Sequence, residues 1–295
     1  MDVTAAGAAL ANKCGLVLLY HAVFERPPAV LAGGLHNVRP SVLRAQLEAV
    51  GRCFEFVDVD TFAALPDPRG YAAVTFDDGY RSVFDSALPV LESLGVPFTV
   101  YLNGAAFDGA AFWRDKVRLV EAMGWVSDFE SFMRGIEPIA GRRFYRYSKD
   151  PSIDSARIDA ELDRFLEFKG APAANLDWCV SRIEDLPGHP LVAYGNHGHH
   201  HYVMSSLDVR RQLAEIRATG EMLARLDGRR ISELFSLPFG DAADMNAATG
   251  QALEKSGYDN VLMSRNRPHA GPGRLFGVTT VERFMPADDP VEFWP

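Results

Sequence analysis

Short apolar segments recur along the chain and alternate with segments of helical periodicity, and this alternation limits the folds open to it. The apolar segments are residues 16–20, 54–59, 72–76, 98–102, 191–194, 234–237, 260–263 and 278–281. Between them, helical faces are formed by Val42, Leu43, Leu47 and Val50, and by Leu213, Ile216 and Leu223 after the expected caps Ser205 and Ser206. Strands that alternate with helices predict an α/β fold of βα units with a largely parallel sheet or barrel.

One long region interrupts this rhythm. Residues 104–188 are polar and aromatic, and include the segment 112–116 and the charged run 142–150. We therefore treat 1–295 as one catalytic domain with an insertion at about 104–188. In barrels, loops at the carboxyl ends of strands carry function, so this insertion either shapes a substrate cleft or only covers hydrophobic surface.

Composition excludes several classes of protein. With 295 residues and 47% hydrophobic content, the chain can bury a full core, and its net charge of -9 opposes binding to nucleic acid. Cys14, Cys53 and Cys179 form no CxxC pair, which favours a reducing compartment over a disulfide framework. Segment 16–20 is too short for a secretion signal, and no segment approaches the ~20 apolar residues of a membrane span. We expect a cytoplasmic protein, and the sequence leaves its oligomeric state open.

Two adjacent carboxylates, Asp77 and Asp78, follow an apolar segment directly and precede Gly79. Such a pair at the end of a buried strand is costly without a cation. Far along the chain, His197 and His201 lie four residues apart, so their rings can converge on one ion together with Asp78. One carboxylate and two imidazoles suit a catalytic zinc ion, or cobalt, nickel or iron, with a position left for water. The alternative is a solvated histidine cluster.

Catalysis requires further groups beside the metal. Asp77 points in a different direction from Asp78 and could take a proton from water, although an aspartate before glycine is also a common turn residue. His21 ends its own apolar segment and could protonate a departing amine at the same barrel mouth, or it could be a surface residue. The Pro-Phe-Gly turn at Phe239 could expose a backbone N–H to an oxyanion, or it could be only a loop turn.

These motifs resemble those of the NodB-homology polysaccharide deacetylases, carbohydrate esterase family 4. The similar segments are TFDDGY at 75–80, GNHGHHHYVMS at 195–205, LPFG at 237–240, and LVLLYHAV at 16–23, the last resembling the opening strand of the circularly permuted, poly-N-acetylglucosamine deacetylase branch. The resemblance extends from about residue 15 to 285 and implies a distorted (β/α) barrel of about seven parallel strands with an inserted helical region.

By motif position, the resemblance implies Asp77 as base, His21 as acid, Phe239 as oxyanion donor, and Asp78, His197 and His201 as ligands of a divalent metal, with zinc expected. His199 and His200 fall at variable motif positions. Tyr80, Pro238 and Trp113 are the expected substrate-binding residues.

The chain departs from the family pattern at two positions. Gly198 replaces a Ser or Thr, and Ser236 replaces an arginine that orients the base; Arg265, Arg283 or Arg114 could substitute. The leading hypothesis is a metal-dependent N-deacylase, removing acetyl or formyl from an amino sugar, with an intracellular precursor of a surface polysaccharide as substrate. The alternatives are hydrolysis of a non-sugar amide or cyclic imide, and an inactive glycan-binding barrel.

Overall fold

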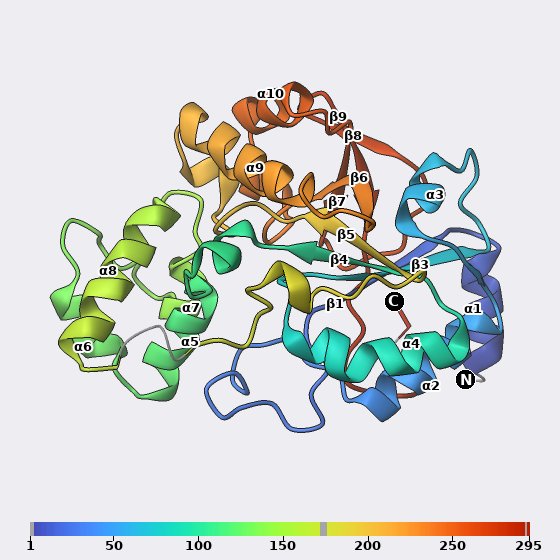
Figure 1. Cartoon of the computed structure of the whole chain (residues 1–295), viewed down its shortest axis with the longest axis horizontal. Coiled ribbons are helices and arrows are strands. Elements are labelled where there is room, and N and C mark those ends of the chain that lie inside the picture. The colour runs from blue at the N-terminus through green and yellow to red at the C-terminus, as the bar shows by residue number, and fades with distance from the viewer. Residues whose placement is uncertain (1–2, 172–175, 293) are drawn as a thin grey trace.

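The structure is a computed structural model that describes residues 3–171, 176–292 and 294–295. Its centre is a mostly parallel sheet in the order β1-β3-β4-β5-β6-β7-β9-β8, with β2 paired to β3 (Figure 1). The strands are β1 Leu16–Tyr20, β2 Glu55–Phe56, β3 Tyr71–Phe76, β4 Phe98–Leu102, β5 Val192–Asn196, β6 Arg230–Ser236, β7 Asn260–Met263, β8 Gly273–Leu275 and β9 Val278–Glu282.

The sheet closes into a barrel. Leu19 N–H donates to the carbonyl of Phe284 at 2.8 Å, and Phe284 N–H donates to the carbonyl of Val17 at 2.8 Å, so the chain after β9 pairs with β1. Within the described part of the chain, the ring consists of the parallel strands β1, β3, β4, β5, β6, β7 and β9. This architecture confirms the predicted distorted barrel of about seven parallel strands.

Alternate residues of the strands fill the barrel. One buried cluster collects Val17, Ala73, Tyr101, Leu234, Leu262 and Val281, one residue from each of six strands. Gly195 of β5 is required here because a Cβ atom would lie 2.3 Å from the ring of Tyr101. Since side chains alternate along a strand, residues two or four positions later also point inward, at the carboxyl end of the barrel.

Helices cover the outside of the barrel (Figure 1). They are α1 Val3–Ala11, α2 Pro40–Gly51, α3 Val59–Ala64, α4 Leu88–Leu94, α5 Trp113–Ala122, α6 Val126–Phe132, α7 Phe144–Tyr147, α8 Ser155–Phe168, α9 Val209–Leu223 and α10 Ala247–Lys255, with short turns of helix including η1 Val83–Ala87, η2 Gly104–Asp108 and η6 Ala242–Asp244. None of the helices in the described ranges is both long and apolar enough to cross a membrane.

The region between β4 and β5 is helical and forms a lobe beside the barrel, containing α5, α6, α7 and α8 (Figure 1). Its buried side chains, among them Val117, Ile158 and Phe165, belong to the same hydrophobic cluster as Phe98 and Val100 of β4. Residues 172–175 of the expected insertion lie outside the described residues.

Three local expectations were wrong. The segment 54–59 gives only the short β2, because Asp58 accepts a hydrogen bond from Thr61 N–H and starts α3. Helix α9 is capped by Asp208, which accepts from the N–H groups of Arg210 and Arg211, and not by Ser205 or Ser206. Strand β8 was not predicted because it is short, exposed along much of its length and antiparallel to β9.

Candidate active site

Two strand ends place His21 and Asp77 side by side. Strands β1 and β3 are parallel, with Tyr20 opposite Phe76, so the next residues of both strands leave the barrel together. Asp77 N–H donates to the carbonyl of Tyr20 at 3.0 Å, which fixes this alignment one residue beyond the strands.

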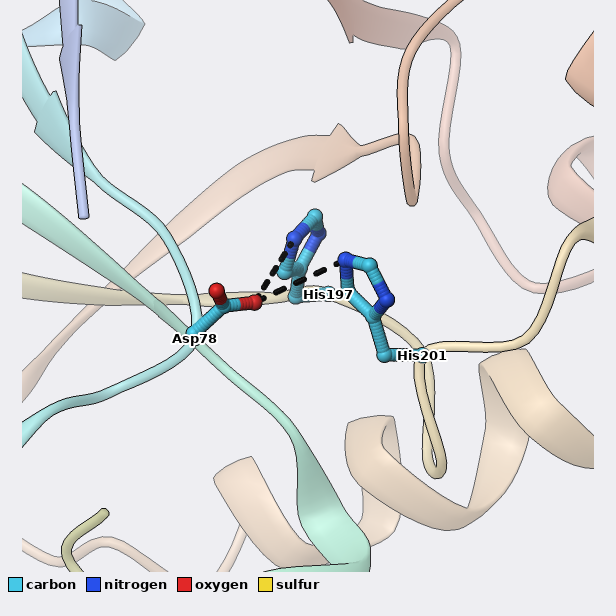
Figure 2. Close-up of side chains that lie close together, drawn as sticks. All are labelled: Asp78, His197 and His201. Atoms are coloured by element: carbon cyan, nitrogen blue, oxygen red, sulfur yellow. Dashed lines mark ion pairs between the residues drawn. The ribbon is translucent and has the colours of Figure 1, made fainter. Parts of the chain in front are cut away.

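Asp78, His197 and His201 converge on one point. The Asp78 Oδ1 atom lies 3.6 Å from Nε2 of His197 and 3.5 Å from Nε2 of His201, and the three side chains are buried (Figure 2). Each can offer one ligand atom, and these atoms lie within 4.8 Å of one another. Because ligand atoms around a zinc ion at about 2.0–2.2 Å are themselves separated by only a few ångströms, this set fits a single divalent ion.

Unusual backbone conformations aim these side chains. Asp78, His201 and Phe239 have φ angles of 72°, 64° and 64°, in the left-handed region that side chains other than glycine rarely adopt. Gly198, with φ of 76°, begins the turn between the two histidines, and its N–H donates to Asn196 Oδ1 at 2.9 Å. Backbone strain of this kind persists where the surrounding fold enforces it, and it gathers at functional sites.

The chemistry of the three side chains also fits a metal. Nδ1 of His197 lies 2.8 Å from the carbonyl oxygen of Ser236, which can only accept, so Nδ1 carries the proton and Nε2 is free for a metal. That Nε2 atom is buried and, within the described chain, has no hydrogen-bond partner. Burial lowers the pKa of His197, and burial with the nearby His197 holds the pKa of His201 well below its ordinary value, so both rings are neutral as ligands must be.

The two carboxylates differ sharply in their surroundings. Burial, and after it the charge of Asp77, raises the pKa of Asp78 to about 7. Burial would raise the pKa of Asp77 too, but the guanidinium of Arg283 outweighs it and lowers that pKa to about 2. Environments that separate two adjacent carboxyl groups in this way assign them different tasks. Among the residues that the structure describes, no arginine or lysine is bonded to Asp78, so this carboxyl group suits a metal, whereas Asp77 is held as an anion.

Arg283 is the partner of Asp77. It is fully buried and donates from both terminal nitrogens to both carboxylate oxygens, at 2.8 and 2.7 Å. Ser236 Oγ adds a hydrogen bond at 3.1 Å to each oxygen of Asp77, so the serine at the expected arginine position contacts the same base. The other two arginines that the sequence offered as partners of Asp77 do not contact it. Arg265 pairs with Glu282, and Arg114 donates to Ser148 and to the Tyr145 carbonyl.

His21 and Phe239 complete the ring of expected residues. His21 lines the same cavity, and its Nδ1 atom is buried with no hydrogen-bond partner in the described part of the chain. Burial, and after it His36, holds the pKa of His21 well below its ordinary value, so the ring is neutral at pH 7. The Phe239 ring packs on His201 with ring centroids 4.6 Å apart.

These side chains open into one cavity of about 610 Å³. Its lining includes Asp77, Asp78, His197, His201, His21 and Phe239, and also basic residues from the helical lobe, namely Arg114, Arg118, Arg146 and Lys149. The lobe therefore shapes the cavity, in addition to burying hydrophobic surface. Sequence reasoning did not single out Arg146, Lys149 or His36, although the charged run 142–150 was visible.

Three expected substrate-binding residues do not line this cavity. Tyr80 is fully buried, and its hydroxyl donates to Asp115 at 2.8 Å while Arg118 donates to it at 3.0 Å. Trp113 is buried and donates from Nε1 to the carbonyl of His201 at 3.0 Å. Pro238 is buried in the turn before Phe239. The sequence assigned all three to the substrate, whereas Tyr80 and Trp113 contact the lining residues Arg118 and His201.

His199 and His200 point away from the three converging side chains. His199 lies 3.2 Å from Asp108, and His200 is held by Glu215, whose carboxylate contacts both its ring and its backbone N–H at 2.7 Å.

The sequence profile of the polysaccharide deacetylase family matches residues 64–163, which include Asp77 and Asp78. No curated protein matches the chain in sequence.

Solved structures share its fold over nearly the whole chain. Deacetylase PplD of Streptococcus pyogenes, solved with acetate, is 14% identical with a TM-score of 0.55, over 94% of this chain and 93% of that one. IcaB from Ammonifex degensii is 17% identical with a TM-score of 0.52, over 92% and 91%. The BpsB deacetylase domain from Bordetella bronchiseptica is 15% identical with a TM-score of 0.52, over 93% and 96%. The chain is thus similar to polysaccharide deacetylases: their family model matches residues 64–163, and its barrel is the fold of these deacetylase structures.

Proposed function

We propose that this protein is a metal-dependent N-deacylase that removes an acetyl or formyl group from an N-acylated amino sugar. The observation that carries the proposal is the pairing of two sites in one cavity: Asp78, His197 and His201 around one point, and Asp77 held by Arg283 beside them. Asp77 Oδ2 lies 3.4 Å from Nε2 of His197, so the base is next to the ligand set.

Asp78, His197 and His201 would hold the divalent ion, with zinc the first candidate by its ligand chemistry. When bound, this ion supplies a Lewis acid that polarises the acyl carbonyl and lowers the pKa of water.

The chain's own groups then move the protons. Asp77, ionised by its contact with Arg283, accepts a proton from the attacking water. The N–H of Phe239, in its left-handed turn, is the proposed donor to the developing oxyanion. His21 is neutral at rest, so it can protonate the amine only after it receives the proton that Asp77 has taken up.

The two departures from the family pattern motivated the alternative of an inactive barrel, and two observations count against it. The arginine missing from the third motif is replaced in space by Arg283. Gly198 stands at a φ of 76°, a conformation in which glycine costs less than serine or threonine.

We place the substrate inside the cell, as a precursor in the synthesis of a surface polysaccharide. Support for this location comes from the buried thiols Cys14 and Cys179, which form no disulfide within the described residues. Fractionation of cells that express the native gene tests it, and recovery of the protein from the periplasm would refute it.

The reaction is tested by a mass-spectrometric screen of N-acetylated and N-formylated amino sugars, with non-sugar amides and cyclic imides as the competing class. We expect the zinc-loaded protein to release acetate or formate from a sugar, and Asp77→Asn to lose at least about 100-fold in rate. Asp85→Asn, which changes an exposed aspartate of η1, is the matched control and should keep full activity. Turnover of the non-sugar amides alone would overturn the sugar assignment.

A further inference from the structure

We propose that the cationic side of the cavity, formed by Arg114, Arg146 and Lys149, binds a phosphoryl group carried by the sugar substrate. This inference rests on the proposed N-deacylase function and narrows its substrate to sugar phosphates or diphosphate-linked sugars.

Arg114 is a buried cation that forms no ion pair within the described residues. It lines the cavity, is 2% exposed, and donates to the neutral Ser148 Oγ at 2.9 Å and to the Tyr145 carbonyl at 3.0 Å. Its guanidinium lies over the rings of Trp113 and Tyr145, 4.6 Å from each centroid. Burial lowers the pKa of Arg114 to about 10, so the group remains charged at neutral pH. A buried guanidinium is stable when an anion compensates it, and within the described residues no carboxylate forms an ion pair with it.

Arg146 and Lys149 add two further cations to the same wall. The Lys149 Nζ atom lies 4.8 Å from the ring centroid of Phe239, and in the described ranges neither residue has a carboxylate within 4.0 Å. Neighbouring cations differ: Arg118 contacts Asp115 at 2.5 Å, and Arg142 pairs with Asp150. The three cations are therefore free to meet a ligand, whereas those around them are neutralised.

Two carboxylates, Asp241 and Asp244, also line the cavity, and the charge of Lys149 acts on Asp244. Both accept backbone hydrogen bonds that cap η6, at 3.1 Å from Ala243 N–H and 2.8 Å from Asp241 N–H. Burial raises the pKa of Asp244 to about 6, so the group is still mostly ionised at pH 7. An anion would avoid both carboxylates and bind at Arg114, which forms no ion pair with a carboxylate in the described residues.

The ring of Phe239 is close both to Arg114 on the cationic side and to His201 of the candidate metal ligands. The Phe239 ring centroid is 4.6 Å from that of His201, and the Arg114 guanidinium is 5.6 Å from the Phe239 centroid. A second cavity of about 460 Å³ shares Arg146 and Lys149 and continues past Arg143. Three cations exceed what one carboxylate requires and match the two or more charges of a phosphoryl or diphosphoryl group.

Calorimetric titration tests the inference without turnover. N-acetylglucosamine 1-phosphate and neutral N-acetylglucosamine are titrated into Asp77→Asn protein, both zinc-loaded and metal-free, because phosphate can also bind zinc. We expect at least 10-fold tighter binding of the phosphorylated sugar in both forms. The double variant Arg146→Gln/Lys149→Gln should lose this preference. Arg134→Gln, an exposed arginine of the same lobe outside the cavity, should keep it.

Turnover by the wild-type protein identifies the source of the phosphoryl group. Faster release of acetate from either UDP-N-acetylglucosamine or farnesyl diphosphate-linked N-acetylglucosamine than from the neutral sugar supports the inference and names the carrier. Equal binding of the phosphorylated and neutral sugars, or a preference unchanged in the double variant, overturns it even if neutral sugars are deacetylated. A phosphate-dependent affinity that persists while no sugar is hydrolysed would leave the subsite standing and refute the deacylase.

Discussion

At the scale of single residues, the site depends on a contrast between two neighbouring aspartates. Asp77 has a buried arginine on both of its oxygens, whereas no arginine or lysine of the described residues is bonded to Asp78. Asp77 is therefore held as an anion, and Asp78 suits the role of a metal ligand. Arg283 lies two positions after Val281, whose side chain points into the barrel, so the side chain of Arg283 is expected to point inward as well. Arg265 lies three positions after the inward-pointing Leu262 of β7, so its side chain is expected to point outward. The alternation of side chains along a strand could therefore have distinguished Arg283 from Arg265 in the sequence.

Replacing Arg283 tests its role in positioning and charging the base. In Arg283→Gln, burial dominates and raises the pKa of Asp77. As the pH falls, Asp77 then becomes protonated, and loses its function as a base, at a higher pH than in the wild-type protein. We expect kcat/KM to fall by at least about 100-fold and the acidic limb of its pH profile to move upward. Arg283→Lys should restore part of the rate and return the limb toward lower pH. Arg265→Gln, which removes an arginine paired with Glu282, is the control. An unchanged limb in Arg283→Gln would show that Arg283 does not set the ionisation of Asp77.

Gly198 offers a second residue-scale test. Installing the family's usual serine at a φ of 76° should lower the free energy of unfolding by about 1 kcal/mol, because the left-handed conformation penalises a Cβ atom. Urea denaturation measures this change. Gly188→Ser, at a position without positive φ and with open space where the new Cβ atom would stand, should leave stability unchanged. Equal effects of the two variants would rule out conformational strain as the cause.

At the scale of elements, strand ends and one helical lobe build the cavity from opposite sides. The parallel strands bring His21, Asp77, His197 and Arg283 to one end. That His21 and Asp77 share this end followed from apolar segments that end in polar residues, whereas the sequence left Arg283 as one of three candidates. The lobe supplies Arg114, Arg146 and Lys149 through tertiary packing that no sequence period encodes. The directions in which the side chains of Tyr80, Trp113 and Pro238 face depend on the same packing, and the sequence did not reveal them.

The lobe's contribution should depend on pH through Lys149. Burial, and after it the charge of Arg114, lowers the pKa of Lys149 to about 8, so the cation is present below that pH and is lost above it. The groups that face Lys149 are Arg114, Tyr145, Arg146 and Asp244. We expect KM for a phosphorylated sugar to rise as pH increases through about 8. Lys149→Arg keeps its charge and should remove this rise. A rise that persists in Lys149→Arg would assign the titration to another group, such as Tyr145.

At the scale of the whole molecule, the alternation of strands and helices predicted a largely parallel sheet or barrel, and the family resemblance implied a barrel of about seven strands. The alternation does not predict that the barrel closes, because closure depends on the pairing of Phe284 with β1, two segments that lie near opposite ends of the sequence. The candidate metal ligands also depend on contacts between distant segments. Asp78 follows β3 and the two histidines follow β5, and only the folded barrel brings them together.

A bound metal should therefore stabilise the folded molecule as a whole. Zinc at 100 times its dissociation constant adds about 2.7 kcal/mol of stability, which should raise Tm by several degrees, and a chelator should reverse the shift. Differential scanning calorimetry measures it. His197→Ala should abolish the shift, whereas His200→Ala, which removes a histidine held by Glu215, should retain it. A shift of equal size in both variants would place the metal elsewhere.

The most direct measurement is acetate release from an N-acetylated amino sugar while zinc is titrated into metal-free protein. We predict activity that rises in proportion to zinc, stops rising at one ion per chain, and is absent at every zinc concentration in Asp78→Asn and His201→Ala. Full activity in the metal-free protein, or activity retained in either variant, would contradict a single catalytic ion held by Asp78, His197 and His201.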